Sequence, residues 1–244
     1  SSAASDVYKS QILLLSSFFS IFLIYNLIFT KNHNLNFLNE DIHLLFYFLF
    51  LLIIFFVFLN FENNFSELFL SLTSSISNAG FSLNNSPNNL SFIFLILVVI
   101  GGSFFSTSSG IRFLKIYSLF KYSINEILSY SKPKNIYINK HLFSKDSFKL
   151  DEIYKYFLSV IVFIISLLIL TFLLTLSGTD FESSFKLSIL TLMNTVNSSM
   201  FGLSDFSFYD LHFMTKYYLI FFMIVGRLEL LTLLIICKKF LFKN

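Results

Sequence analysis

A single arginine near the centre of an apolar stretch stands out among the residues that could do chemistry. Arg227 lies 11 residues from Lys216 and 11 from Lys238. A guanidinium at that depth of a membrane costs about 2.5–3.5 kcal/mol unless it finds partners. Glu229, two residues on, would face away on a helix and is a poor partner. We expect Arg227 to have one of two partners. One is the set of free carbonyls near residues 106–110, where a helix is expected to break as described below, and the other is a carboxylate on another helix.

Two breaks rich in Asn, Ser and Gly interrupt other apolar stretches. The first reads NAGFSLNNSPNN from Asn78, and the second lies near Ser198 to Gly202. Such residues stop a helix, so each break predicts a short helix that enters the membrane, a turn and a new helix. Irregular backbone at that depth is tolerated only where it is buried in protein or faces water. Gly80 is then either a loop residue that exploits its missing Cβ or an ordinary helix C-cap.

A third group of small residues, GGSFFSTSSG from Gly101 to Gly110, lies where a membrane helix is expected. Hydroxyl groups compete for backbone hydrogen bonds and glycine weakens a helix, so the helix should break there. The alternative is close packing of helices through small residues, which is common in membranes.

The composition excludes a soluble protein. Only 13% of the residues are charged, against about 25% in soluble domains. Charge-free stretches over residues 10–30, 42–61 and 156–179 are each long enough for one membrane helix. One cysteine, Cys237, excludes an internal disulfide, and the four scattered His do not have the spacing of a metal site. No covalent chemistry is implied, so we expect neither an enzyme nor a nucleic-acid partner.

A weak internal repeat and the charge distribution complete the pattern. A shift of 120 residues places Phe65–Leu83 on Phe185–Leu203, so that the two polar breaks overlay. Nine of the 17 Lys and Arg lie between Arg112 and Lys155. By the positive-inside bias this connection is cytoplasmic and the two turns open outward.

Three strings resemble the Trk/Ktr/HKT superfamily of potassium transporters. LVVIGGSFFSTSSGIRFLKI, from Leu97 to Ile116, is similar to the Gly-rich break in the second helix of the family's third repeat. MIVGRLELLTLL, from Met223 to Leu234, is similar to the final-helix signature, and SISNAGF, from Ser75 to Phe81, to the filter string. The resemblance covers nearly the whole chain and implies a Trk-type membrane subunit.

The resemblance implies an all-α integral membrane fold of potassium-channel-like repeats, each a helix, a pore helix with a re-entrant filter loop, and a second helix. Residues 1–38 would be the end of repeat two with its outer helix, 39–129 repeat three, 130–149 a basic cytoplasmic connection and 150–244 repeat four. Four such repeats surround one pore in the family. We therefore expect the chain to be a fragment that needs the missing N-terminal repeats.

The resemblance also implies roles for residues. Backbone carbonyls of the filter loops would replace the ion's hydration shell, and an intramembrane loop braced by Arg227 would gate the pore. The expected ion selectivity filter is Asn78, Ala79, Gly80, Phe81, Ser198, Ser199, Met200 and Phe201. K⁺ is expected on the backbone of Asn78, Ala79, Gly80, Ser198 and Ser199. The expected gating loop contains Gly101, Gly102, Ser103, Phe105, Ser106, Thr107 and Gly110.

The chain departs from the family pattern at three places. Met200 stands where the second loop would have its filter glycine, and a positive φ there would cost about 1–2 kcal/mol. The segment from Ser1 to Asp6 has no glycine where repeat two would have its filter. Phe105 replaces a small residue and would add bulk that plugs the gating loop. Altered selectivity, weak conduction and a decayed copy all remain open.

The sequence thus predicts a multi-pass protein of the bacterial inner membrane that takes up K⁺ or Na⁺ without a cofactor. The alternative is a non-conducting or degenerate accessory subunit that assembles with an intact homologue. The expected partners are the lipid bilayer, a second copy in a homodimer and a cytosolic nucleotide-binding regulatory subunit. The basic connection would either dock that subunit or only set topology and contact anionic lipids.

Overall fold

In a computed structural model the chain folds into helices joined by loops, and the described residues form no β-strand. The structure describes residues 2–21, 23, 35–58, 65–82, 90–130, 150–197, 199–203, 206–209, 211–227 and 239. Ser198 and residues 131–149 of the predicted basic connection lie outside them. The described helices are α1 (Ser2–Phe18), α3 (Leu35–Phe58), α4 (Phe65–Ile76), α5 (Ser91–Val99), α6 (Phe113–Ser129), α7 (Leu150–Leu176), α8 (Phe181–Met193), the short 3-10 helix η3 (Ser199–Phe201) and α9 (Phe213–Arg227).

Two of the described helices are long and apolar enough to cross a membrane, α3 over Glu40–Val57 and α7 over Leu150–Leu176. Only 28% and 33% of these segments are buried inside the molecule. Phe50 on α3 and Phe172 on α7 are both more than half exposed. Apolar surface of this extent is typical of a lipid-facing protein. The prediction of an all-α integral membrane fold is confirmed.

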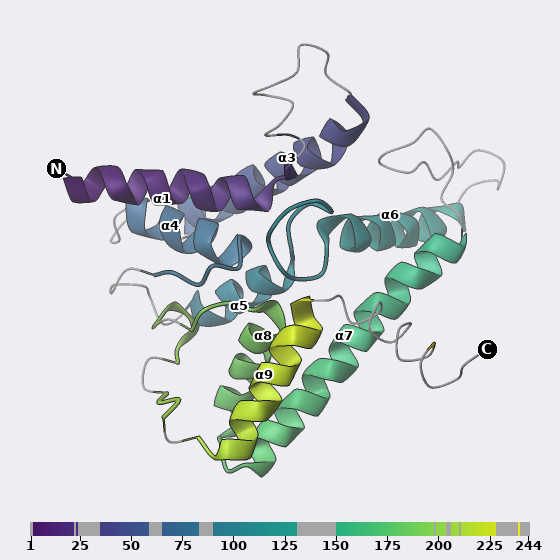
Figure 1. Cartoon of the computed structure of the whole chain (residues 1–244). Coiled ribbons are helices and arrows are strands. Elements are labelled where there is room, and N and C mark those ends of the chain that lie inside the picture. Colours follow the sequence, from purple (N-terminus) through teal and green to yellow (C-terminus); the bar gives the residue numbers. More distant parts are fainter. Residues whose placement is uncertain are drawn as a thin grey trace.

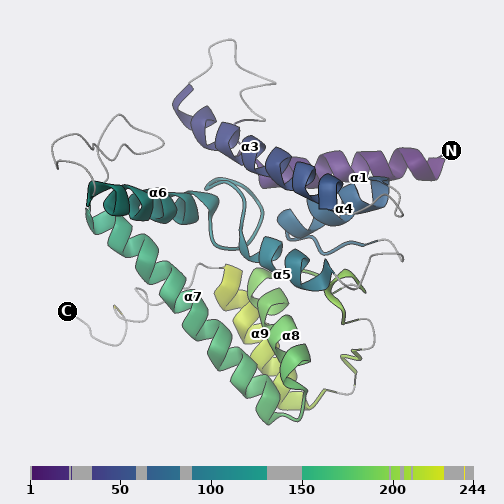
Figure 2. The ribbon, with the colours of Figure 1, turned by 180° about the vertical axis from the view of Figure 1, so that it is seen from behind.

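The helices follow the same order twice. A long helix, a short helix and a further helix occur as α3, α4 and α5, and again as α7, α8 and α9. Figure 1 shows α7, α8 and α9 as one packed group, with α1 and α4 in a second group and α5 between the two groups. The view from behind, in Figure 2, shows α3 on the same side of the molecule as α1 and α4, and the rings of Phe48 on α3 and Phe69 on α4 meet edge to face with centroids 5.9 Å apart.

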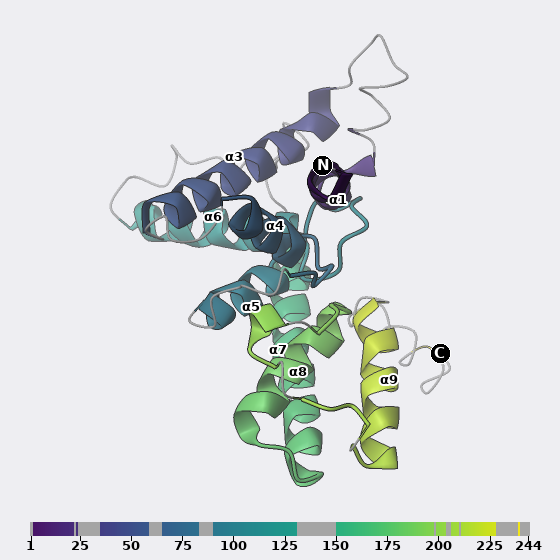
Figure 3. The same ribbon diagram turned by 90° about the vertical axis from the view of Figure 1, so that its left-hand side faces the viewer.

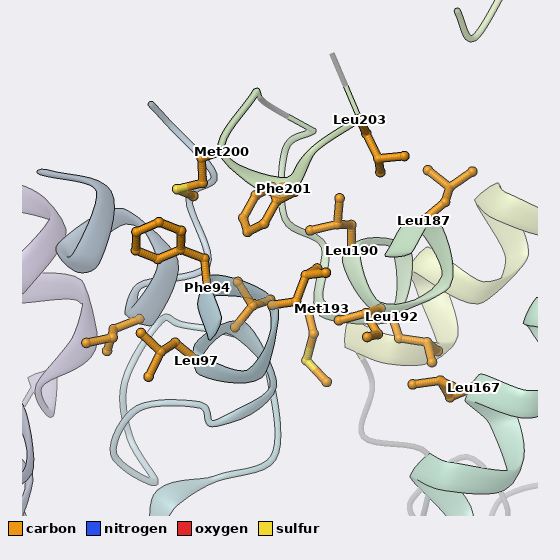
Figure 4. Packing of buried hydrophobic residues seen from close by; sticks show 14 of the residues in the cluster. Phe94, Leu97, Leu167, Leu187, Leu190, Leu192, Met193, Met200, Phe201 and Leu203 are labelled. Atoms are coloured by element: carbon orange, nitrogen blue, oxygen red, sulfur yellow. The ribbon is translucent and has the colours of Figure 1, made fainter. Parts of the chain in front are cut away.

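The two groups share one core. Helix α5 contacts α4 on one side and both α8 and η3 on the other, while α8 packs against α7 and α9. Phe94 of α5, Leu190 of α8 and Phe201 of η3 are almost completely buried in this core, and Figure 4 shows their side chains gathered together. Because α5 is shared, the loops that follow α4 and α8 are brought to the same place.

Helix α1 is shorter than the sequence predicts. The uncharged stretch over residues 10–30 predicts one continuous helix, but α1 ends at Phe18. The hydroxyls of Ser16 and Ser17 bond to carbonyls three residues back, which weakens the helical hydrogen-bond ladder. The carbonyl of Phe18 then accepts from the N–H of Ser103, 3.1 Å away. This contact with a distant segment lies at the interruption of the helix over Phe19 and Ser20, and Ile21 is helical again.

Candidate ion-conducting site

The short helices α4 and α8 are buried although they carry many hydroxyl groups. Residues 70–78 of the first segment and 187–193 of the second are all buried. Their hydroxyls bond to carbonyls of their own helix, as Thr73 does with Phe69 and Thr191 with Leu187. These hydroxyls are satisfied locally, Ser74 being the exception in the described part of α4, and each helix can lie inside the protein as a pore helix requires.

Each short helix is followed, within two residues of its end, by an asparagine with left-handed backbone. Asn78 has φ 60° and Asn194 has φ 53°, the two positive-φ residues other than glycine in the described chain. Asparagine tolerates this region better than other residues with a Cβ. The same two backbone hydrogen bonds form at both ends. They are Asn78 N to Ser75 O (3.2 Å), Ala79 N to Ser74 O (3.0 Å), Asn194 N to Thr191 O (3.1 Å) and Thr195 N to Leu190 O (2.9 Å).

These matching bonds relate the two loops by a shift of 116 residues, not 120. The register expected from the sequence is therefore wrong by four positions, about one helical turn. Asn194, Thr195, Val196 and Asn197 occupy the places that Asn78, Ala79, Gly80 and Phe81 occupy in the first loop. Val196, and not Met200, is the counterpart of Gly80.

The residues expected to form the second filter instead pack into the core. Met200 and Phe201 lie in η3 and are fully buried, and Figure 4 shows them above Phe94. Met200 has no positive φ, so the strain expected there is absent. Ser199 lies at the edge of this turn, where its hydroxyl is 3.1 Å from that of Ser82 in the first loop. The apolar side chain of Met200 explains its position, because burial in the core removes it from water.

The two loops touch through their backbones at Gly80. Gly80 has φ 81°, and a Cβ added to it would overlap the carbonyl oxygen of Val196 and lie 2.9 Å from the carbonyl carbon and the nitrogen of that residue. No side chain fits between the loops at this point. A glycine is therefore needed at this position for two reasons. Its backbone has a positive φ, and the neighbouring loop leaves no space for a Cβ. Phe81, the next residue, is 61% exposed and points away from the core.

Buried polar atoms without a hydrogen-bond partner gather at these loops. In the described part of the chain they include Ser74 Oγ, both amide atoms of Asn78, Thr195 Oγ1 and Asn197 Oδ1. Each such atom costs about 1–3 kcal/mol, and a concentration of them is typical of a functional site. A cavity of about 310 Å³ lies beside the second loop, with Asn194, Thr195 and Val196 among its lining residues.

The helix that follows the first loop is broken, as the sequence predicts. Helix α5 ends at Val99 and α6 begins at Phe113. Backbone bonds from Gly101 N to Ile111 O (2.9 Å) and from Ile111 N to Val99 O (3.1 Å) join the two ends of the intervening loop. The break is therefore a closed, ordered loop, which is visible between α5 and α6 in Figure 1.

We call residues 101–111 the intramembrane loop, after the position that the sequence predicts for it. Gly101, Gly102, Ser103 and Ser106 are buried within it. A Cβ on Gly102 would overlap the carbonyl oxygen of Phe18 at the end of α1. Phe105 and Thr107 are exposed, and Gly110 has φ 100°. Phe105 is 41% exposed and contacts the ring of Phe104 edge to face, with centroids 5.0 Å apart.

Two arginines bind the intramembrane loop. Arg227 at the end of α9 donates from Nη1 to the hydroxyl of Ser109 at 3.0 Å. The expected contact with loop carbonyls is made by Arg112 instead. Its Nη1 lies 3.3, 3.1 and 3.2 Å from the carbonyl oxygens of Ser103, Ser106 and Ser108. The sequence thus predicts the right loop for Arg227 but the wrong atoms.

Two adjacent carboxylates hold the intramembrane loop to its surroundings. Glu40 Oε1 accepts from the N–H of Phe104 at 3.0 Å. Asp41 accepts from the N–H of Ser20 at 3.0 Å and from its hydroxyl at 2.6 Å. Glu40 and Asp41 are both only 2% exposed. Helix α3 therefore binds the loop and the segment after α1 through neighbouring residues.

An ion pair lies at the start of α8. Lys186 is 2.6 Å from Glu182 one turn earlier on α8. The hydrogen bond and charge of Lys186 hold the pKa of Glu182 below its ordinary value. The Nζ of Lys186 lies close to Gly202, so the pair places a lysine beside the segment that follows the second loop.

Close packing of α9 on α8 positions Arg227. A Cβ on Gly226 would overlap the carbonyl oxygen of Leu192 and lie 2.9 Å from its carbonyl carbon. Figure 3 shows α9 running beside α8. The C-terminal end of α9, at Arg227, reaches the intramembrane loop at Ser109. Asn194 strengthens the contact, since its Nδ2 donates to the carbonyl of Met223 at 3.0 Å.

The substitution Gly226→Ala tests this packing. Alanine normally stabilises a helix by about 0.5–1 kcal/mol relative to glycine. Here we expect a loss of about 1–3 kcal/mol, because the added methyl group has no space. Thermal unfolding in lipid nanodiscs measures the change. A rise in the unfolding temperature would contradict the close contact.

Sequence reasoning missed Arg112, Glu40, Asp41 and Asn194 as site residues. The sequence indicates only an inner-side charge for Arg112. The sequence does contain a signal for Asn194. A shift of 116 residues pairs it with Asn78 and also pairs two phenylalanines of the first segment with two of the second. No sequence signal connects Glu40 with Phe104, which lies 64 residues further on.

Comparisons with known proteins find similarity in structure but not in sequence. No family model and no curated protein matches the chain. The potassium transporter TrkH from Vibrio parahaemolyticus has a similar structure, with a TM-score of 0.77 and 21% sequence identity. The match covers 94% of this chain and 51% of the TrkH chain. This chain therefore shares the fold of the potassium transporter TrkH over nearly its whole length and spans about half of that protein.

Proposed function

We propose that this chain forms part of the ion path of a transporter that takes up K⁺, or Na⁺, across the bacterial inner membrane. The observation that carries the proposal is the pair of loops after α4 and α8. They repeat the same left-handed asparagine and hydrogen bonds, and they meet backbone to backbone at Gly80 and Val196. Carbonyl oxygens of such loops can replace the water around a monovalent cation. No cofactor and no covalent step are needed.

In this proposal the ion-binding backbone is Asn78, Ala79 and Gly80 in the first loop and Asn194, Thr195 and Val196 in the second. The second set replaces Ser198 and Ser199, since the repeated hydrogen bonds point to the earlier residues. Val196 is 56% exposed, so its side chain is not packed into the core.

The intramembrane loop would act as the gate. Its backbone is small enough to lie in the ion path, and Gly101, Gly102, Ser103, Ser106 and Gly110 contribute no large side chain. Exposed Phe105 and Thr107 would then be the residues that narrow it. Arg227 would bring positive charge to the loop through Ser109, and a fixed positive charge slows cation passage.

A second candidate function is a non-conducting accessory subunit that assembles with an intact homologue. The observation in its favour is Val196, because this loop lacks the glycine that the first loop requires. Both functions need further repeats, and the chain spans about half of TrkH. We propose the bilayer, further pore-forming repeats, a second copy in a homodimer and a cytosolic nucleotide-binding regulatory subunit as partners.

Expression of the complete gene product in a bacterium that lacks potassium uptake tests the proposal. We expect growth at low potassium to be rescued, and Gly80→Ser to reduce the rescue, because serine at φ 81° is strained and would overlap Val196. Val196→Gly should leave or raise uptake if the chain conducts. Transport is refuted if growth is not rescued and Gly80→Ser leaves any flux unchanged. An accessory subunit is indicated if uptake depends on a homologue and neither substitution alters it.

A further inference from the structure

Four oxygens of the intramembrane loop surround one nitrogen atom of Arg112. Besides the three carbonyl oxygens of Ser103, Ser106 and Ser108, the hydroxyl of Ser106 lies 3.3 Å from Nη1. A guanidinium Nη carries two protons, so it cannot form good hydrogen bonds with four oxygens at once. The oxygens are therefore arranged by the fold of the loop around a centre, as around a bound ion.

The loop itself, and not the arginine, builds this arrangement. Ser106 Oγ donates to the carbonyl of Ser103 at 2.8 Å and lies 2.8 Å from Ser108 Oγ. Ser108 Oγ in turn accepts from the N–H of Gly102 at 2.9 Å. Ser106 and Ser108 are both less than 10% exposed. These bonds hold the carbonyl of Ser103 and the hydroxyl of Ser106 without any contribution from Arg112.

The surroundings favour positive charge at this point. Helix α5 ends at Val99 just before the loop, and a helix C-terminus attracts cations. The buried carboxyl group of Glu40 accepts from the N–H of Phe104 in the same loop. The N-terminus of α6 at Phe113 opposes a cation, but a helix end carries only a partial charge.

We propose that these four oxygens form a second monovalent-cation site and that Arg112 occupies it as a tethered cation. The inference rests on the proposed transport function. The guanidinium and the transported ion then compete for the same oxygens, and an ion takes the site only when Arg112 leaves. Arg112 is thus a positioning residue that sets how often the loop is available to ions.

Equilibrium binding of Tl⁺, a substitute for K⁺, tests the site. The complete gene product in lipid nanodiscs is compared with Arg112→Ala and Arg112→Lys. Arg112→Ala should bind an additional Tl⁺ ion per chain, because the oxygens are released. Arg112→Lys should bind the same number as the unaltered protein, since the ammonium group can fill the site. Lys121→Ala, which removes a basic residue further along α6, is the matched control and should add no ion.

Thermal unfolding separates loss of the site from loss of the fold. Arg112→Ala should unfold at a lower temperature without Tl⁺ and regain part of the difference when Tl⁺ is added, whereas the Lys121→Ala control should not respond to Tl⁺. A stable Arg112→Ala protein that binds no additional ion would overturn the proposal. So would a Tl⁺-dependent rise that is equally large in the control.

The test is distinct from that of the transport function. Binding is counted at equilibrium, so it can be read even if no variant conducts. The double substitution Gly80→Ser with Arg112→Ala should still bind the additional ion, because Gly80 lies in the filter loop. Transport without an additional ion in Arg112→Ala refutes the tethered cation alone, and an additional ion without transport refutes the proposed function alone.

Discussion

Replacing Gly80 with alanine is expected to reduce K⁺ uptake by at least about tenfold, since 1.4 kcal/mol corresponds to a factor of ten. The left-handed backbone alone costs alanine about 1–2 kcal/mol. The new methyl group would also overlap the carbonyl oxygen of Val196, so the two loops must separate. Uptake of Rb⁺ into cells that express the complete gene product measures the effect, with the amount of protein in the membrane determined in parallel.

Gly178→Ala is the matched control for this prediction. Gly178 lies in the turn between α7 and α8 and has φ 94°, but no atom lies within 4 Å of an added Cβ. The control therefore introduces comparable backbone strain without contact between the loops. We expect its uptake to stay close to that of the unaltered protein. Equal losses in the two variants would show that strain alone matters and that the contact with Val196 does not.

Replacing Asp41 with alanine is expected to lower the free energy of unfolding by about 2–3 kcal/mol. Asp41 accepts two hydrogen bonds from Ser20 in a buried site, and a bond to a charged group contributes about 1.5–3 kcal/mol. Without the carboxylate the N–H of Ser20 is left buried without its acceptor. Denaturant unfolding in mild detergent, followed by fluorescence of the 12 tyrosines, measures the loss.

Asp41→Asn separates the hydrogen bonds from the size of the side chain. The amide oxygen can still accept from the N–H of Ser20, and the amide nitrogen can donate to its hydroxyl. We expect less than half of the loss seen with alanine. A loss as large as that of Asp41→Ala would mean that the negative charge, rather than the pair of bonds, stabilises this contact.

Much of the fold could be predicted from the sequence. Charge-free stretches predict α3 and α7, because the length of an apolar run is set by the thickness of the bilayer. The first polar break predicts where α4 ends, since asparagine and glycine stop a helix, whereas α8 ends at Met193, before the second break expected near Ser198. The break between α5 and α6 follows from the same reasoning. These features depend on neighbouring residues in the sequence, so they can be predicted without knowledge of long-range contacts.

The position of the second loop could not be predicted as well. A shift of 120 residues aligns leucines and phenylalanines, which are so frequent here, with 36 Phe in the chain, that matches arise by chance. The correct shift of 116 aligns Asn78 with Asn194, and only the left-handed backbone reveals why that pair matters. The position of Met200 depends on the core around Phe94, which forms only in three dimensions.

The partners of charged residues were the hardest to predict. Arg112 follows a glycine-rich break and precedes a basic stretch, so its sequence neighbours suggest a cytoplasmic charge. Its true partners are carbonyls of the preceding residues, which become available only because the chain folds back on itself. The roles of Arg227 and of both loops in ion passage remain predictions that the transport experiments test.

The neighbouring positions of Glu40 and Asp41 have a mechanical consequence. One carboxylate is tied to the intramembrane loop at Phe104 and the other to the segment after α1 at Ser20. Consecutive residues of a helix move as one rigid unit, so any tilt or shift of α3 displaces both attachments together. A force on the lipid-facing surface of α3, such as a change in bilayer thickness, is thereby transmitted to the loop and to the end of α1 at the same moment.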